Sequence, residues 1–356
     1  MADLDSFPEI QKLDSKNLAG SIEQLGKQCE QVWQEVGKIE FLPDLSSAKQ
    51  VVVMGMGGST LGAHVIHSLY FDKLKTPIEI VNGYHVPGYV DSDTLVVLSS
   101  YSGTTEEVLT AYQEAKEKGA KAVAISSGGE LGKLVEGKEV SGYVFEPKFN
   151  PSGQPRMGLG YSILGQVLIL AKLGFLEFSE GDFAKVVAVV DKTNESNRTN
   201  VETADNLAKQ TAQKFLNKLP FLFASEHLVG NIHVFANQIN ENAKSLSAYF
   251  ALPEANHHLI EGLVSPDARS DVTFFLLKSN LYSPRIVKRY DITNLIFEKN
   301  GLESIIFEPQ STTKLEQVFE FLTFGSWVSF YLAILYGRDP APIPNVDFLK
   351  SEMTKP

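Results

Sequence analysis

The most informative run in the chain is Val51-Val52-Val53-Met54-Gly55-Met56-Gly57-Gly58-Ser59-Thr60-Leu61-Gly62. Its four consecutive apolar residues, three of them Val, predict a short strand that is buried on both faces. The glycines that follow allow a tight turn and let a ligand approach the backbone closely. A strand, a glycine-rich turn and a helix start leave free N–H groups pointing the same way, so the run predicts an anion site.

Two familiar phosphate-binding motifs do not fit this turn. A dinucleotide fingerprint requires Gly at the sixth position counted from Gly55, where Thr60 stands, and the next predicted strand ends at Asn82 without an acidic residue. A nucleoside-triphosphate loop requires Lys directly after the glycines, but the first Lys to follow is Lys73. The turn alone is equally consistent with a packing device that binds nothing.

A second strand-to-helix turn favours phosphate. The apolar run Leu95–Leu98 predicts another buried strand, and Ser or Thr fills five of the seven positions from Ser99 to Thr105. An ordinary helix N-cap needs only one hydroxyl. Because the carboxyl ends of parallel strands meet at one edge of a sheet, we expect both turns to share a single site.

Length and composition limit the kinds of protein this can be. The chain has 356 residues, 43% of them hydrophobic and 21% charged, which predicts a globular protein of two domains. A net charge of −11 argues against nucleic acid or an anionic membrane as partner. The single Cys29 excludes an internal disulfide and suits the cytoplasm. We see neither a signal peptide nor a long uncharged apolar run, so we expect no membrane insertion.

The order of apolar and polar segments predicts an α/β fold with two mostly parallel sheets, each flanked by helices. Strands are expected at 51–54, 78–82, 94–98, 121–125, 143–147, 221–225, 272–277 and 303–307. The expected organisation is an N-terminal helical segment (1–48), a first α/β domain (49–178), a helical connection (179–215) and a second α/β domain with a C-terminal helix and tail (216–356).

Three further residues are candidates for chemistry. Arg156 lies in a loop rich in Pro and Gly after the first sheet, where it is either solvated or a donor to an oxyanion. Glu241 lies near the end of a predicted helix, and His257 follows it by sixteen residues. Taken singly, such residues are more often surface polarity. The His257-His258 pair also raises a metal site, but no Cys or carboxylate spacing supports one, so we expect no metal.

Taken together, these motifs resemble one family. They are Gly57-Gly58-Ser59, Ser100-Tyr101-Ser102-Gly103-Thr104-Thr105-Glu106, Gln154-Pro155-Arg156, Asn240-Glu241-Asn242, Pro253-Glu254-Ala255-Asn256-His257 and Asp347-Phe348-Leu349-Lys350. In this order, over residues 48 to 350, they resemble the bifunctional phosphoglucose/phosphomannose isomerases, which are built from two sugar isomerase (SIS) domains. The serine-rich turn marks SIS domains generally, and the Glu, His and Lys positions point to the isomerase.

The resemblance implies aldose–ketose isomerisation of a hexose 6-phosphate through a cis-enediol, without metal or cofactor. It implies Glu241 as the base between C1 and C2, Arg156 as the group that stabilises the enediolate, and Lys350 near the ring oxygen or O1. His257 would assist ring opening from the neighbouring subunit of a homodimer. The implied phosphate-binding residues are Gly57, Gly58, Ser59, Ser100, Ser102 and Thr105.

Two departures from the family pattern leave alternatives open. His258 stands where the family usually has Asn, so either ring could act in ring opening. Members with dual specificity carry a Thr near the C-terminal lysine, whereas residues 337–350 contain none, so acceptance of mannose 6-phosphate stays open. The alternatives to the isomerase are another SIS enzyme, such as an amino-sugar phosphate isomerase, and a non-catalytic sugar-phosphate sensor.

Overall fold

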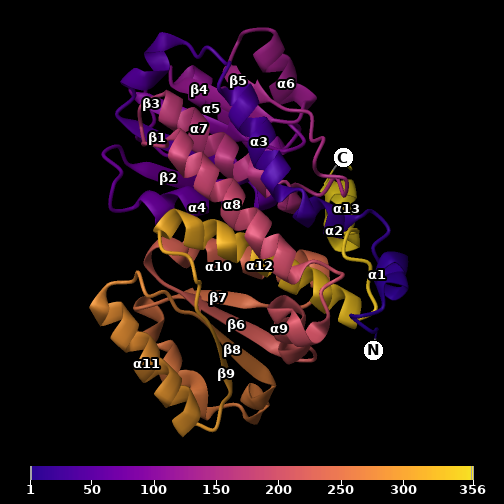
Figure 1. The fold of residues 1–356 in the computed structure, drawn as a ribbon. Coiled ribbons are helices and arrows are strands. Elements are labelled where there is room, and N and C mark those ends of the chain that lie inside the picture. The colour runs from indigo at the N-terminus through magenta and orange to yellow at the C-terminus, as the bar shows by residue number, and fades with distance from the viewer. Residues whose placement is uncertain (1, 354, 356) are drawn as a thin grey trace.

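The computed structural model describes residues 2–353 and 355, and it contains two parallel sheets flanked by helices, as the sequence predicts (Figure 1). The strands are β1 (Gln50–Gly55), β2 (Ile78–Val81), β3 (Thr94–Ser99), β4 (Lys121–Ser126) and β5 (Ser141–Val144) in the first sheet, and β6 (Leu219–Ala224), β7 (Ala248–Ala251), β8 (Val272–Leu277) and β9 (Ser304–Phe307) in the second. The helices are α1 (Phe7–Leu13), α2 (Leu18–Glu23), α3 (Leu25–Val36), α4 (Leu61–Tyr70), α5 (Glu106–Glu117), α6 (Gly129–Glu136), α7 (Gly165–Lys172), α8 (Glu180–Asn197), α9 (Leu207–Phe215), α10 (Val229–Gln238), α11 (Pro284–Lys299), α12 (Lys314–Leu335) and α13 (Pro344–Met353).

The first sheet has the strand order β2-β1-β3-β4-β5, and β1 pairs in parallel with both neighbours. Alternate residues of β1 enter different cores: Val51 and Val53 pack with α3, α4 and α7, whereas Val52 packs with α5 and α6. This alternation is the two-residue period of a strand, and it explains why β1 is apolar throughout. Both faces of the sheet are therefore covered, and ligands can reach only its edges.

The second sheet has the order β7-β6-β8-β9 and is packed with aromatic rings. Phe274 of β8 stacks on Phe297 of α11 at 4.2 Å, while the next residue, Phe275, meets Phe235 of α10 on the opposite face. Helices α10 and α12 thus cover one face of this sheet and α11 covers the other (Figure 1).

The two halves of the molecule meet where α4 packs against α10. A Cβ on Gly230 of α10 would lie 2.4 Å from the carbonyl oxygen of His64 on α4, so only glycine permits this approach. One hydrophobic core runs through both halves, from Val51 in β1 to Phe223 in β6. The sheets therefore hold a fixed relation to each other.

Several elements differ from the sequence-based expectation. The short edge strand β7 and the helix α6 were not expected, and the C-terminal tail contains α13. The sequence analysis also did not single out α12, which is long and apolar enough to cross a membrane by length and composition. In the fold, 94% of its most apolar window is buried, as in the core helix of a globular protein.

Candidate active site

The glycine-rich turn after β1 and the hydroxyl-rich turn after β3 lie side by side at the carboxyl edge of the first sheet. β1 and β3 are neighbours whose last residues, Gly55 and Ser99, are paired in register. The Ser99 hydroxyl donates to the Ser59 carbonyl (2.7 Å), and the Tyr101 N–H donates to Ser59 Oγ (2.8 Å). The turns are thus joined directly, as parallel strand ends predict.

The second turn concentrates hydroxyl groups at the start of α5. Ser100 Oγ and Thr105 Oγ1 are 2.7 Å apart, and Ser100 Oγ also accepts the Gly103 N–H. Ser102 is exposed at the tip, where its Oγ accepts from Thr104. Because the first N–H groups of a helix have no partner within it, α5 adds donors at the same place. A phosphate group could be bound here by hydroxyl and amide donors alone.

A third turn, after β4, packs against the hydroxyl-rich turn and is hydrogen-bonded to it. Gly103 has φ +70°, and a Cβ there would lie 1.8 Å from the carbonyl oxygen of Gly128. The Ser127 N–H and hydroxyl both donate to the Tyr101 carbonyl. No side chain can stand at residue 103 without displacing this neighbour, so the glycine fixes the shape of the hydroxyl-rich turn.

Arg156 lies against the glycine turn and is almost fully buried, with 1% of its surface exposed. A Cβ on Gly58 would lie 2.9 Å from the Arg156 backbone nitrogen, so the two loops touch. The side-chain N–H groups of Arg156 donate to five acceptors. These are the Asn242 Oδ1 (2.5 Å), the Gln154 Oε1 (2.8 Å), the Glu241 Oε2 (3.2 Å) and the Pro340 and Ala341 carbonyls (both 2.9 Å). A guanidinium has five N–H donors, so every one of them has a protein acceptor.

Glu241 faces Arg156 from a π-helical turn, residues 239–243, that ends α10. Its side chain is 28% exposed, so it is open to a ligand on one side, and its carboxylate is held by the guanidinium on the other. Burial raises the pKa of Glu241 above its usual value, and the positive charges of Arg156, Lys244 and Lys350 oppose this rise. A partly buried carboxylate with a raised pKa is suited to act as a general base near neutral pH.

Lys350 lies on α13. Its side chain is solvent-exposed, and its positive charge opposes the rise in the Glu241 pKa. The segment that leads into α13 is the one whose carbonyls, at Pro340 and Ala341, accept from Arg156. The structure thus brings together the Gly57–Ser59 turn, Arg156, Glu241 and Lys350.

Lys244 is part of the same cluster and was missed by sequence reasoning. Its Nζ donates to the carbonyls of Asn242 (3.1 Å), Asp339 (2.8 Å) and Pro340 (2.9 Å). Burial and the nearby Arg156 charge lower its pKa to about 8. The residue has left-handed backbone (φ 53°), which turns the chain out of α10. The only available signal was its position three residues after Glu241, where a lysine is usually a solvated surface charge.

His257 lies on a different element, after β7. It ends a short helical turn, residues 254–257, that follows the carboxyl end of β7, and it is exposed. The neighbouring His258 Nε2 is 3.1 Å from the Glu254 carboxylate. Among the described residues there is no cluster of three or more His, Cys, Asp or Glu side chains that could hold a metal ion. His257 therefore follows the end of β7, whereas Glu241 follows the end of α10.

Comparison with known proteins places this chain in a family. Residues 44–131 match the SIS domain, and residues 204–353 match the bacterial phospho-glucose isomerase C-terminal SIS domain. A bifunctional phosphoglucose/phosphomannose isomerase from Caldicellulosiruptor bescii is 36% identical over 94% of this chain and 98% of its own length. A protein of the same name from Aquifex aeolicus is 31% identical over 91% of this chain and 94% of its own.

A solved structure gives the fold an independent match. A hypothetical protein from Thermus thermophilus superposes with a TM-score of 0.74, covering 97% of this chain and 93% of its own, at 15% identity. That likeness concerns the fold alone, whereas the two relatives share sequence along almost their full length. The sequence resemblance is therefore confirmed, and the chain belongs to the bifunctional phosphoglucose/phosphomannose isomerase family, with two SIS domains.

Proposed function

We propose that this chain interconverts glucose 6-phosphate and fructose 6-phosphate, and also accepts mannose 6-phosphate, as a cytoplasmic aldose–ketose isomerase that needs no metal or cofactor. The observation that carries the proposal is the ion pair of buried Arg156 with partly buried Glu241, beside the glycine-rich turn and the hydroxyl-rich turn. The names of the full-length relatives favour this reaction over an amino-sugar enzyme or a sensor. The domain limits at residues 48, 178 and 215 are part of the proposal.

In the proposed mechanism the phosphate binds at the two turns and the open-chain sugar extends toward Glu241. The carboxylate removes the proton from C2 of the aldose and returns it to C1, while O1 gains a proton and O2 loses one. Because all donors of Arg156 are engaged, the guanidinium acts mainly by its charge and by fixing Glu241. Its longest bond, the one to Glu241, is the one that a substrate oxyanion could replace.

A coupled assay on protein treated with EDTA tests this proposal. Fructose 6-phosphate is supplied, and the formation of glucose 6-phosphate and mannose 6-phosphate is followed separately. We expect both products at a rate that EDTA leaves unchanged. Glucose 6-phosphate alone would contradict the dual specificity, and the absence of both products would overturn the proposal.

We further propose that the enzyme is a homodimer in which each site receives His257 from the partner subunit. α10 begins beside the carboxyl end of β6 and runs back along the sheet, so Glu241 lies at the opposite end from His257. The ten residues of α10 alone span about 15 Å. That distance is too long for both groups to act on one sugar within a single subunit.

Mixing two inactive variants tests the shared site. Glu241→Gln and His257→Ala are each expected to be inactive as homodimers. Random exchange of subunits makes about half of the dimers mixed, and each mixed dimer would contain one intact site. Activity should therefore recover to roughly a quarter of the wild-type value. If His257 acted within its own subunit, every site would carry a substitution and no activity would return.

The hydroxyl-rich turn is expected to determine affinity for the phosphate. Replacing Ser100 and Ser102 together by Ala should raise KM for fructose 6-phosphate by about 10²- to 10⁴-fold, because each of the two lost hydrogen bonds to a charged group is worth about 1.5–3 kcal/mol. The exposed Ser196→Ala on α8 serves as the control and should leave KM unchanged. An unchanged KM in the double variant would place the phosphate elsewhere.

The charge of Lys244 is expected to shift the acid limb of the pH–rate profile, which reports the pKa of Glu241. Lys244→Met removes a positive charge that lowers the pKa of Glu241, so the acid limb should move to higher pH. Lys244→Arg retains the charge and should restore the profile. Lys192→Met, an exposed change on α8, is the control. An acid limb that stays in place in Lys244→Met would contradict this role.

A further inference from the structure

The chain between α12 and α13 contacts both cationic side chains that lie beside the proposed base. The Pro340 carbonyl accepts from Arg156 and from Lys244, both at 2.9 Å. The Asp339 carbonyl accepts a further bond from Lys244 at 2.8 Å. We call residues 339–341 the strap. Because backbone carbonyls of the strap are the acceptors, its position helps to fix where both positive charges lie.

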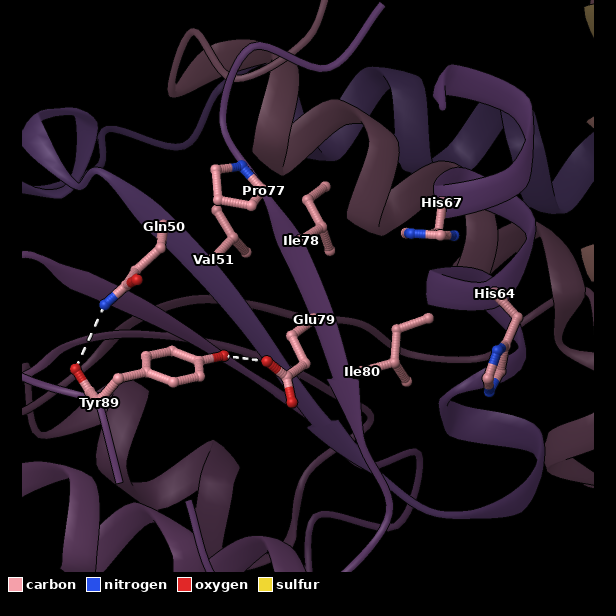
Figure 2. Close-up of a pocket in the computed structure, with 9 residues that line it drawn as sticks. All are labelled: Gln50, Val51, His64, His67, Pro77, Ile78, Glu79, Ile80 and Tyr89. Atoms are coloured by element: carbon pink, nitrogen blue, oxygen red, sulfur yellow. Dashed lines mark hydrogen bonds between the residues drawn. The ribbon is translucent and has the colours of Figure 1, made fainter. Parts of the chain in front are cut away.

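The outer edge of the first sheet gives these two charges no support. Figure 2 shows a hollow of about 620 Å³ beside β2, with His64 and His67 on α4 and Ile80 of β2 facing them. In the part of the chain that the structure describes, none of the residues lining this hollow hydrogen-bonds to Arg156 or Lys244. Support for the two cations therefore comes from the strap and from groups of the site itself.

The strap is held in turn by the carboxylate of Asp339. One oxygen, Oδ1, accepts the Ala341 N–H at 2.9 Å, which forms a short turn within the strap. The other, Oδ2, accepts from the hydroxyl of Ser15, a residue 324 positions earlier in the chain. The Asp339 side chain is half-buried, whereas Pro340 and Ala341 are buried. One carboxylate thus fixes the shape of the strap and joins it to the N-terminal segment.

The N-terminal segment presents the Ser15 hydroxyl from an ordered turn. Ser15 lies between α1 and α2, and Figure 1 shows α2 close to α13. The preceding residue, Asp14, accepts the N–H groups of Leu18 (2.6 Å) and Ala19 (2.9 Å) at the start of α2. Both of these α2 residues are buried. The bond from Ser15 therefore attaches the strap to a packed part of the molecule and not to a free end of the chain.

The charge of Asp339 acts in the same direction as its contacts. Burial and the nearby Arg156 lower the pKa of Lys244 to about 8, and the negative charges of Asp339 and Glu241 oppose this fall. Without the Asp339 carboxylate, less of Lys244 would be protonated at neutral pH. The ammonium would then contribute less to keeping Glu241 ionised, because its charge lowers the pKa of that carboxylate.

We propose that Asp339 is a positioning residue for the isomerisation, acting through the strap without touching the sugar. Its carboxylate holds the strap carbonyls in place, and these carbonyls hold Arg156 and Lys244 beside Glu241. This inference rests on the proposed function. It adds that the N-terminal segment, through Ser15, belongs to the support of the active site.

Steady-state kinetics of two Asp339 variants test this role. Asp339→Ala should lower kcat for fructose 6-phosphate by about 10- to 100-fold, the usual cost of misplacing catalytic groups, while KM changes by no more than about three-fold. Asp339→Asn keeps an oxygen for the Ala341 N–H and an amide that can donate to Ser15, so kcat should return to within about three-fold of the wild type. Asp205→Ala, an exposed change before α9, is the control and should alter neither constant.

Chemical labelling of Lys244 gives a readout that does not depend on turnover. Its Nζ donates to three carbonyls, two of them in the strap, so an amine-acylating reagent should modify it slowly. The reaction is run well above the pKa of Lys244, so that ionisation does not differ between variants, and is located by mass spectrometry. Asp339→Ala should label at least about ten times faster than the wild type, relative to the exposed Lys192, because the strap opens more often. Asp339→Asn and Asp205→Ala should label as the wild type does.

The outcomes separate this inference from the proposed function. If the wild type isomerises fructose 6-phosphate but Asp339→Ala changes neither kcat nor the labelling of Lys244, the function holds and the inference is wrong. If the wild type does not isomerise this sugar, the proposed function fails, and faster labelling in Asp339→Ala still shows that Asp339 holds the strap. A rise in KM as large as the fall in kcat would make Asp339 a ligand of the sugar and overturn the positioning role.

A milder variant guards against unfolding of Asp339→Ala, which circular dichroism would reveal. Ser15→Ala removes only the bond to the N-terminal segment and should shift kcat and Lys244 labelling in the same directions, by about three-fold or more. If Ser15→Ala matches the wild type in both measurements, the N-terminal segment does not support the site and that part of the inference is wrong.

Discussion

Replacing Glu241 by Gln is expected to lower kcat for fructose 6-phosphate isomerisation by about 10²–10⁴-fold, the usual contribution of a general base. The amide has nearly the shape of the carboxylate and can still accept from Arg156, so the pocket should keep its form. It cannot take a proton from carbon. Binding of the sugar phosphate, measured by calorimetry, should therefore change by no more than a few fold.

The matched control is Glu195→Gln, an exposed carboxylate on α8, which should retain full activity. Thermal unfolding of both variants should stay close to that of the wild type. Should Glu241→Gln lose binding as severely as turnover, the residue would be a ligand for the sugar and not its base.

Burial of Glu241 also predicts how activity depends on pH. The base acts only as the carboxylate, so activity should fall as the pH drops through the Glu241 pKa. Burial raises that pKa, so the fall should begin at a higher pH than it would for an exposed glutamate. In the Glu241→Gln variant, the residual activity should lose this acid limb.

The position of the two turns that are proposed to bind phosphate could be predicted because local sequence specifies them. Apolar runs identify β1 and β3 as buried parallel strands, and the residues after each strand must then lie at the same edge of the sheet. The Tyr101 N–H to Ser59 Oγ bond follows from that arrangement. This arrangement depends only on the two strands and the turns that follow them, so residue types and their order were sufficient to predict where the turns lie.

The environment of Arg156 could not be predicted, because its partners come from three separate regions of the chain. The segment at Pro340 is far away in sequence, and it supplies backbone carbonyls that leave no trace in side-chain chemistry. Lys244 also donates to the Pro340 carbonyl. Its backbone is left-handed, which its residue type does not predict. Sequence pattern identified the charged groups but not the network that holds them.

The short elements were missed for a different reason. β7 has only four residues and a mixture of exposed and half-buried positions, so neither strand alternation nor a helical period is visible. α13 has no buried residue among those described, so it lacks the apolar stripe that marks a packed helix. Both lie next to groups proposed to act on the sugar, which is where the sequence was least informative.

Replacing Arg156 by Met is expected to have the largest effect on stability, lowering the free energy of unfolding by about 3–5 kcal/mol. The substitution leaves Glu241 without its ion-pair partner and removes the donor to the buried Pro340 and Ala341 carbonyls. Activity should also fall steeply, because the segment leading to Lys350 loses its anchor. Chemical denaturation and kcat measure the two effects.

Arg156→Lys separates the charge of this residue from its geometry. The ammonium restores a positive charge near Glu241, but it has three donors for five acceptors and cannot span them as the flat guanidinium does. Stability should therefore recover only in part, whereas the pKa of Glu241, read from the acid limb, should return close to the wild-type value. Arg285→Met, an exposed change on α11, should alter neither quantity. Full recovery of stability by Lys would show that charge alone is required, and the bridging role assigned to Arg156 would be wrong.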